Sequence, residues 1–550
     1  MSADTLQHHL VQPYKSVANK ASEEYKRNYE EWQPIVAELH ERLEEATAEG
    51  KEKHIKLHKK RGQLLARERI DLLLDEDSPF LELCQLAGYG QDDMTLGGSI
   101  VGGIGLVCGI ECMVIASVPT LAGGSMNETS VLKGGRLAQI IHENGLPVIN
   151  LTQSGGANLE QQFKVFHRGG GGFRNQAILS KSGVPSCCVV FGSSTAGGAY
   201  TPGMSDCVIM VKKQAQVFLG GPPLVQMATG EVTDAESLGG ADMHSRISGV
   251  SDQLAVDELD AIRKAREWVS HLNWTKVGQL PKRHLLSNFE EPLYPADDIL
   301  GVASANIRVP FDAMEVIARL VDGSRFTAFK PLYGVNLITG WAFIHGIPVG
   351  IIANNNVLFT AESNKATQFI QLCNMKHTPL VFLQNITGFM VGKRYEEDGI
   401  IKAGARFINA VSNSTVPAIT IMMGASYGAG NYAMCGRSYN PSHTLSDSYS
   451  PGQTPSAPSW VPNNLQGTTE LTVGKFFRAG IEIDEEVAST RKQMFQSLVE
   501  SESDVYYTSA RMLDDGIIDP RDTRTVLGFC LSVVYNKEVK GGNLYGVSRM

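Results

Sequence analysis

Two glycine-rich turns hold the residues of this chain that are best suited to chemistry. The first reads SSTAGGAY at residues 193–200, and the second reads GASYGAGN at residues 424–431. Each turn follows an apolar stretch typical of a buried strand and precedes a stretch that we expect to be helical. Glycine lets a ligand approach the backbone closely, and the first N–H groups of a helix lack an intrahelical acceptor. We therefore predict that both turns stabilise developing oxyanions with backbone N–H groups.

The two turns occupy equivalent positions in a long internal repeat. Pro147 matches Pro379 and Pro185 matches Pro417, and both pairs are 232 positions apart (379 − 147 and 417 − 185). The same offset relates Lys133 to Lys365, Gly156 to Gly388, Gly192 to Gly424 and Gly198 to Gly430. A single glycine-rich turn often serves only close packing, but recurrence at a fixed offset indicates two copies of one fold. Two such turns favour a reaction with two oxyanions.

The elements that must position the turns follow the same order in both copies. We expect a hairpin that turns at Gly109 in the first copy and at Gly346 in the second. Helices are expected to begin near Thr129 and near Glu362. Buried strands are expected at residues 148–151, 188–191, 380–383 and 419–422. This order predicts an α/β fold in which helices cover the sheets.

A second pair of turns precedes the first pair. SGGAN at residues 154–158 and NITGF at residues 385–389 follow the strands after the paired prolines, and we expect them to line a shared cleft. The chain has no Ser-His-Asp order, no Gly-x-Ser-x-Gly elbow and no His-Glu-x-x-His motif. We expect His142, His167 and His244 on the surface or in the core. The predicted chemistry therefore depends on backbone groups and not on a side-chain base.

Composition excludes several classes of protein. With 550 residues, 43% hydrophobic and 19% charged, the chain is long enough for two globular domains plus extensions. Its net charge of −9 does not favour binding to a nucleic acid, and no apolar run is long enough for a membrane span. Nine scattered cysteines without a Cys-x-x-Cys pair indicate a reducing compartment and no structural zinc. We expect a soluble intracellular protein, in the mitochondrial matrix of a eukaryote and otherwise in the cytoplasm.

The chain divides by texture into three parts. Residues 1–75 are expected to form a loose tail up to about residue 18 and then a helical arm, whose basic run at residues 51–69 is either a solvated helix face or a phosphate or partner contact. Residues 76–285 and 286–550 would hold the two copies, with a polar, proline-bearing linker near residues 273–300. A helix is expected after Pro520.

Several long segments resemble one enzyme family along nearly the whole chain. The likeness lies in RERIDLLLDEDSPFLEL, TAGGAYTPGMSD, FLGGPPLVQMATGE, LGGADMHSRISGVSD, VIARLVDGSRFTAF, LQNITGFMVG, SYGAGNYAMCGR and SARMLDDGIIDPRDTR. These segments are similar to carboxyltransferase (β) subunits of biotin-dependent acyl-CoA carboxylases, most of all the methylcrotonoyl-CoA carboxylase type. The resemblance implies two tandem crotonase-like (ClpP/crotonase) domains with an N-terminal helical arm, and a ligase of leucine degradation that carboxylates 3-methylcrotonoyl-CoA.

The resemblance also implies partners and cofactors. Biotin would be carried by a biotinylated, ATP-using biotin carboxylase α subunit, because this chain has no Ala-Met-Lys-Met or Val-Met-Lys-Met site. The chain would form a dimer-based homo-oligomer, usually a hexamer, with an active site between the acyl-CoA side of one subunit and the biotin side of another. A coenzyme A thioester would be the substrate, and no metal is expected in this subunit. Carboxybiotin would release CO₂, and the biotin enolate would take the substrate proton.

Site residues carry over from the family position by position. Gly197 and Gly198 would donate to the thioester enolate oxygen, and Ala429 and Gly430 would donate to the ureido oxygen of biotin. Coenzyme A would contact Ser154, Gly155, Gly156, Ala157, Gly220, Gly221, Pro222, Gly239 and Gly240, with Lys133 and Arg136 as possible phosphate partners. Thr387, Gly388 and Phe389 would form the wall on the biotin side.

The chain departs from the family pattern in three places. Residues 442–470 are rich in Ser, Pro, Thr, Asn and Gly, so they predict a loop where the family has a buried strand. A local reading-frame or gene-model error would explain this, as would a genuine loss of a core strand. Gln153 stands where related enzymes usually have an aspartate, and LAGGSMNETSV at residues 121–131 replaces a more aromatic loop. These two changes leave the identity of the acyl substrate open. Carboxylation of propionyl-, geranyl- or longer acyl-CoA, biotin-dependent acyl-CoA decarboxylation and a non-catalytic paralogue remain alternatives.

Overall fold

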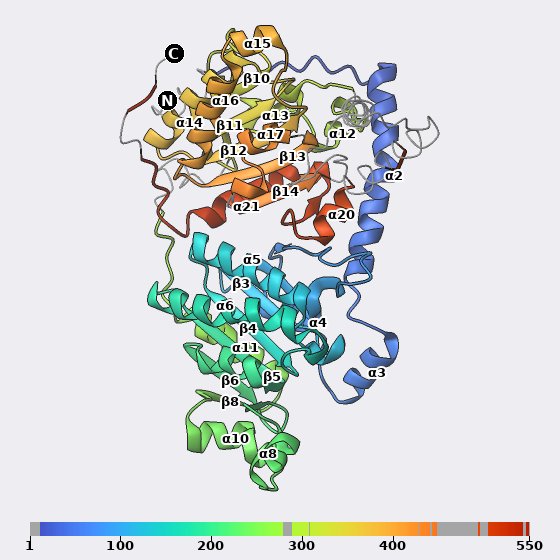
Figure 1. The fold of residues 1–550 in the computed structure, drawn as a ribbon, viewed down its shortest axis with the longest axis vertical. Helices are drawn as coiled ribbons and strands as arrows, with labels where there is room; N and C mark the ends of the chain where they lie inside the picture. The colour runs from blue at the N-terminus through green and yellow to red at the C-terminus, as the bar shows by residue number, and fades with distance from the viewer. Residues whose placement is uncertain are drawn as a thin grey trace, which may run out of the picture. The chain divides into compact units, whose positions relative to one another are not determined.

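The two copies of the repeat lie in separate compact units. The structure is a computed structural model that describes residues 11–278, 289–306, 309–426, 428–439, 443–447, 493–494, 504–542 and 546–548. One unit holds residues 41–277 and 510–512, and the other holds the rest of the chain. Each unit is built on one sheet with its own helices (Figure 1). The predicted division of the chain into an arm and two domains, with boundaries at residues 75 and 285, stays a prediction.

The first unit contains the sheet of the first copy. Its order is β1-β2-β3-β4-β5-β6-β8, with β7 pairing with β5. The bounds are β1 Phe80–Glu82, β2 Ile100–Val107, β3 Ile110–Ser117, β4 Val148–Ser154, β5 Ser186–Thr195, β6 Cys207–Val211, β7 Gln216–Phe218 and β8 Gln253–Ala255. β2 and β3 are antiparallel, and β3 to β6 and β8 run parallel. Cys108 and Gly109 both have positive φ (51° and 76°), which confirms the expected tight hairpin turn at Gly109.

The second unit repeats this arrangement. Its sheet has the order β15-β14-β13-β12-β11-β10-β9. The bounds are β9 Thr327–Ala328, β10 Leu337–Ile344, β11 Ile347–Asn354, β12 Leu380–Ile386, β13 Ala418–Ser426, β14 His443–Asp447 and β15 Ile517–Ile518. The β10–β11 hairpin turns at His345 and Gly346, again with positive φ (48° and 71°). The helix after each hairpin, α5 Glu128–Asn144 or α14 Thr360–Met375, begins within two residues of the expected position.

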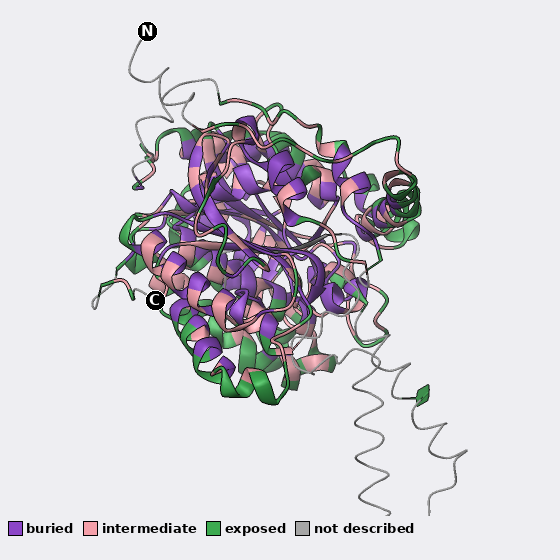
Figure 2. Ribbon diagram, turned by 90° about the horizontal axis from the view of Figure 1, so that it is seen from above, coloured by how far each residue is buried: buried purple, intermediate pink, exposed green. Residues whose placement is uncertain are grey.

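Both central sheets are covered by helices, so their strands are apolar on both faces. Ile149 and Leu151 of β4 and residues 187–191 of β5 are fully buried. Figure 2 shows the strands mostly as buried. The expected helix after Pro520 is α21 Thr523–Val534. In the described part of the chain, no helix has the length and apolar character needed to cross a membrane.

A short strand lies where the sequence predicts a loop. β14 pairs in parallel with β13 through Ile419 opposite His443, and with β15 through Ser446 opposite Ile517. The expectation of a loop was wrong for residues 443–447, because backbone groups form the ladder whatever the side chains are. Residues 448–470 lie outside the described residues.

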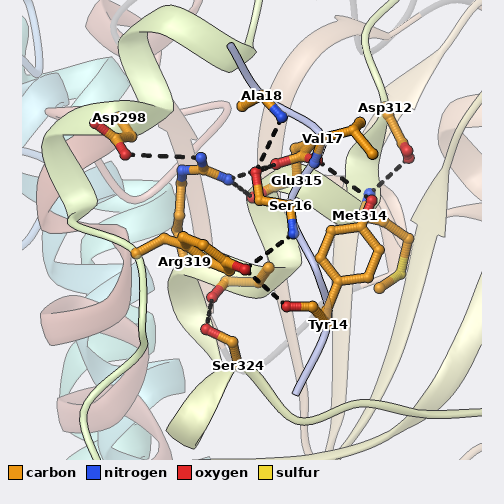
Figure 3. Close-up of polar contacts among 12 residues, drawn as sticks. Tyr14, Ser16, Val17, Ala18, Asp298, Asp312, Met314, Glu315, Arg319 and Ser324 are labelled. Atoms are coloured by element: carbon orange, nitrogen blue, oxygen red, sulfur yellow. Dashed lines mark hydrogen bonds and ion pairs between the residues drawn. The ribbon is translucent and has the colours of Figure 1, made fainter. Parts of the chain in front are cut away.

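The helical arm consists of α2 Glu23–Ala46, α3 Glu52–Lys60 and α4 Ala66–Leu73. The segment before α2 is fixed to the second unit, so the expected loose tail was wrong for residues 14–18 (Figure 3). Glu315, on α13 Ala313–Leu320, accepts hydrogen bonds from the Ser16 hydroxyl (2.5 Å) and the Val17 N–H (2.8 Å). Arg319 donates to the same carboxylate over 2.8 Å. Burial disfavours the charged form, but these bonds hold the pKa of Glu315 below its usual value.

We expect a Glu315→Gln variant to release the segment before α2. The lost charge weakens hydrogen bonds worth about 1.5–3 kcal/mol, so proteolytic cleavage within residues 11–18 should become about 10- to 100-fold faster. Limited proteolysis measures this rate, with Glu23→Gln as the control because Glu23 is exposed on α2. Acidification should have the same effect. The pKa of Glu315 in the folded state lies below its unfolded value near 4.3, so ionised Glu315 stabilises the folded state above that pH. This stabilisation is lost as the pH falls through the folded-state pKa.

Candidate active site

The first glycine-rich turn forms the start of a short helical segment directly after β5. Residues Ala196–Ala199 form a 3-10 turn that continues into α7 Tyr200–Gly203. The Tyr200 N–H donates to the carbonyls of Gly197 and Gly198, and the Ser194 hydroxyl donates to the Gly198 carbonyl over 3.0 Å. The Gly197 carbonyl and the Gly198 N–H belong to one trans peptide and point in opposite directions. Because the Gly197 carbonyl points toward Tyr200, the Gly198 N–H points out of the N-terminal end of the turn. This geometry suits stabilisation of an oxyanion.

A cavity of about 350 Å³ opens at this turn. Ser154, Gly197 and Gly198 lie in its wall, so the structure brings these three predicted site residues together. β3 and β4 contribute Ile115, Val148 and Thr152, and α5 and α6 Gln162–Lys181 contribute the remaining sides. Gly124, Ser125 and Met126, from the loop that departs from the family pattern, also line the cavity.

The predicted residues between 220 and 240 reach the same region through β7. β7 pairs with β5 immediately before the turn, with Ser194 opposite Val217 and Thr195 opposite Phe218. Gly220, Gly221 and Pro222 follow β7, where Gly221 caps α8 Pro222–Thr229. Gly239 ends α9 Ala235–Gly239, and Gly240 bridges to Gln216. A Cβ on Gly239 would lie 2.3 Å from the Val217 carbonyl oxygen, so this approach requires glycine.

The turns at residues 154–158 and 385–389 share a backbone hydrogen bond and a β-bridge at equivalent positions. The Met126 N–H donates to Gly156 O (2.8 Å), and 232 positions later the Leu358 N–H donates to Gly388 O (3.1 Å). Each glycine has positive φ, 92° and 125°. Ala157 bridges to Met126 as Phe389 bridges to Leu358, and Gly155 donates to Gly123 O over 3.0 Å. The repeat therefore extends to the backbone geometry of the turns.

On the second copy, the two turns lie against each other. Ala429 and Gly430 belong to α17 Gly428–Ala433, which follows β13. A Cβ on Gly430 would lie 2.5 Å from Ile386 Cγ1 and 3.2 Å from Gly388 Cα. The structure therefore places the turn of Gly430 beside the segment of Thr387, Gly388 and Phe389. Ala429 and Thr387 are exposed, so this edge faces solvent in the isolated chain.

The expected phosphate contacts of Lys133 and Arg136 were wrong, because both side chains are buried within the fold. Lys133 Nζ donates to Ile100 O over 3.0 Å, at the first residue of β2. Its repeat partner Lys365 donates to Leu337 O over 2.8 Å, at the first residue of β10, and burial lowers the pKa of Lys365 to about 8. These lysines connect a helix to a strand end in each copy. His244 is a core residue, as expected, and its Nε2 lies 2.7 Å from Val217 O.

Comparison with known proteins identifies the class first. The family described as "Carboxyl transferase domain" matches residues 57–543. A geranyl-CoA carboxylase β subunit from P. aeruginosa, known as a crystal structure, superimposes with a TM-score of 0.87 at 39% identity, covering 98% of this chain and all of that one. The fold is therefore the crotonase-like fold of carboxyltransferases, as expected.

Curated relatives define the family more narrowly. A probable biotin-dependent acyl-coenzyme A carboxylase beta2 subunit of Mycobacterium tuberculosis is 52% identical, over 93% of this chain and 95% of its own length. A probable mitochondrial methylcrotonoyl-CoA carboxylase beta chain of Drosophila melanogaster is 46% identical, over 97% of this chain and 95% of its own. The chain belongs to the carboxyltransferase (β) subunits of biotin-dependent acyl-CoA carboxylases.

Proposed function

We propose that this β subunit transfers a carboxyl group to an acyl-CoA of the 3-methylcrotonoyl type. The observation that carries the proposal is the glycine-rich turn at the end of β5, which opens into a cavity large enough for an acyl group. The relatives named above support the same class of substrate. The acyl chain would enter the cavity, and the thioester oxygen would lie at Gly197 and Gly198.

Each part of the first copy then has a task in the proposed reaction. The N–H groups of Gly197 and Gly198 stabilise the negative charge that develops on the thioester oxygen when the substrate loses a proton. Residues 154–157, 220–222 and 239–240 contact coenzyme A around β7. Because donors held by the fold need no reorganisation during the reaction, they lower the barrier without a side-chain base.

We infer that biotin binds beside the turns of the second copy. A Cβ on Gly388 or Gly428 would meet no atom within 4 Å, so these backbone positions leave space beside the start of α17. Biotin, attached to a partner protein, supplies the carboxyl group when bound. Ala429 and Gly430 donate to its ureido oxygen, and Thr387, Gly388 and Phe389 form the wall.

The proposed reaction requires partners. We propose a biotinylated, ATP-using α subunit and a dimer-based homo-oligomer, as a hexamer, in which the first copy of one subunit faces the second copy of another. The complex would work in the mitochondrial matrix of a eukaryote and in the cytoplasm otherwise.

Carboxylation by the reconstituted complex tests the proposal. The full chain and its α subunit would be assayed for ATP-dependent incorporation of labelled bicarbonate into 3-methylcrotonoyl-CoA and other acyl-CoAs. Turnover with at least one acyl-CoA supports the proposal. Assembly without turnover on any acyl-CoA would contradict it and favour a non-catalytic paralogue, whereas decarboxylation without ATP-dependent fixation would favour a decarboxylase.

A further inference from the structure

A further cavity lies in the unit that contains the second copy, apart from the turns of that copy. Its volume is about 380 Å³. Residues of β9, β10, α13 and α14 line it, together with the loop after β9 and the segment before α2. None of its lining residues belongs to residues 385–389 or 424–431. Most of the lining side chains are apolar, and they include Met314, Phe326, Phe329, Val335, Leu337 and Ile338.

A lysine brings a positive charge to this apolar wall. Lys365 lies on α14, lines the cavity and is only 2% exposed. Its Nζ donates to Leu337 O over 2.8 Å and to Gly334 O over 3.3 Å. Because an ammonium group has three N–H donors, one of them has no acceptor among the described residues. A buried charge is costly unless it is paired, so an anion in the cavity would be stabilised there.

The charged side chains around Lys365 leave room for such an anion. Glu362 attracts the ammonium, but its two oxygens accept hydrogen bonds from the Asn336 and Phe359 N–H groups. No carboxylate in the described part of the chain forms an ion pair with Lys365. Lys330 adds a second positive charge nearby. Burial and Lys330 lower the pKa of Lys365 to about 8, so the amine stays mostly protonated near neutral pH.

The equivalent place in the first copy is closed. Lys133, which corresponds to Lys365, donates to Ile100 O, and the Glu82 carboxylate attracts it. The pocket beside Ile100 has a volume of only about 20 Å³. Residues 46–49 of the arm and Glu82 line this pocket. The open volume beside Lys365 is therefore a property of the second copy and not of the repeated fold.

We propose that the cavity beside Lys365 binds a small carboxylic acid with an aromatic or branched apolar body, whose carboxylate accepts a hydrogen bond from the lysine. An apolar cavity of about 150 Å³ holds one benzene ring. About 380 Å³ therefore accommodates a ring with a short side chain, against the rings of Phe326 and Phe329. The inference does not rest on the proposed function, because the cavity is separate from the residues assigned to acyl-CoA and biotin.

Calorimetric titration of the full chain with 3-phenylpropanoate and its neutral amide, 3-phenylpropanamide, tests the proposal. We expect wild type to bind the acid at least about 10-fold more tightly, because a hydrogen bond between charged groups is stronger than one to a neutral group. Lys365→Met should remove this preference. Ala328→Phe should weaken binding of both compounds at least about 10-fold, since Ala328 lines the cavity and the phenyl ring would fill it.

Two matched controls should bind as wild type does. Thr327→Phe changes the neighbouring residue of β9, which points to the opposite face and does not line the cavity. Lys133→Met removes the corresponding contact between helix and strand in the first copy. If Lys365→Met does not fold, the comparison of Ala328→Phe with Thr327→Phe still decides the matter.

Three results would overturn the proposal. The first is that folded wild type does not bind the acid, or binds the acid and the amide equally. The second is unchanged binding by Ala328→Phe. The third is displacement of the acid by 3-methylcrotonoyl-CoA, which would place the acid in the cavity at the oxyanion turn. Binding of the acid by a chain that carboxylates no acyl-CoA would uphold this proposal and contradict only the proposed function.

Discussion

A Gly198→Val variant is expected to lose about 100- to 1,000-fold in kcat while remaining folded. Loss of one oxyanion donor costs this much in enzymes that stabilise a developing oxyanion with backbone groups. The valine methyl groups would occupy the space beside the Gly198 N–H, where the thioester oxygen must approach. The backbone should tolerate the change, because Gly198 has no positive φ and its Cβ would lie 3.6 Å from Ser194 Oγ, an ordinary contact.

Steady-state kinetics of the reconstituted complex and a thermal unfolding curve check this prediction together. Gly203→Val is the matched control, because Gly203 ends α7 close to the turn, is exposed and has no atom within 4 Å of its Cβ. Its kcat should stay within about twofold of wild type. Near-normal turnover of Gly198→Val would remove the oxyanion role. The equivalent Gly430 is a poorer probe, since any side chain there would collide with Ile386.

The parts of the fold that local chemistry determines could be predicted from the sequence. Gly109 and Gly346 mark the hairpins because a tight two-residue turn needs positive φ, which glycine adopts without strain. The strand after Pro379 begins with the apolar run Leu380–Leu383, and the strand after Pro147 begins with residues 148–151, which are apolar except for Asn150, as is typical of buried parallel strands. The offset of 232 positions reappears in the hydrogen bonds of Gly156 and Gly388, because both copies have glycine at the position of the turn that has positive φ.

Features that depend on distant partners could not be predicted in this way. The run Gly169–Gly172 has the local propensity of a loop, yet it lies within α6 because the neighbouring residues of that helix impose the conformation. Lys133 is a cation near a glycine-rich turn, and only the packing of α5 on β2 shows that its charge is used internally. Gly134 and Gly135 on α5 and Gly171 and Gly172 on α6 line the cavity at the oxyanion turn, and only the packing of the two helices shows this.

The polar segment before α2 shows the same limit. Its sequence resembles that of a mobile terminus, and its fixed position comes from partners far along the chain, among them the Glu315 carboxylate, the Tyr294 hydroxyl and the Ser324 carbonyl. Burial of such a group is favourable only when every oxygen has donors, and those donors are not neighbours in sequence.

Removal of the buried ion pair between Arg69 and Glu258 is expected to have the largest effect on stability. Arg69 lies on α4 and Glu258 begins α11 Glu258–Ser270, and the guanidinium donates to both carboxylate oxygens over 2.8 and 2.9 Å. The side chains are 1% and 6% exposed, and the guanidinium stacks 4.2 Å above the ring of Phe191. We expect Arg69→Met to lower the free energy of unfolding by about 3–5 kcal/mol, because a buried carboxylate loses its counter-charge.

Because Phe191 belongs to β5, this pair also supports the strand that presents the oxyanion turn. Denaturant unfolding would measure the loss, with Arg263→Met as the control, since Arg263 lies on α11 with an exposed side chain and should change stability by no more than about 0.5 kcal/mol. The double variant Arg69→Met/Glu258→Leu should be more stable than Glu258→Leu alone, in which Arg69 is buried without its carboxylate. Equal stability of wild type and Arg69→Met would show that the pair makes no net contribution. A double variant no better than Glu258→Leu would show that lost packing on Phe191, and not an uncompensated charge, sets the cost.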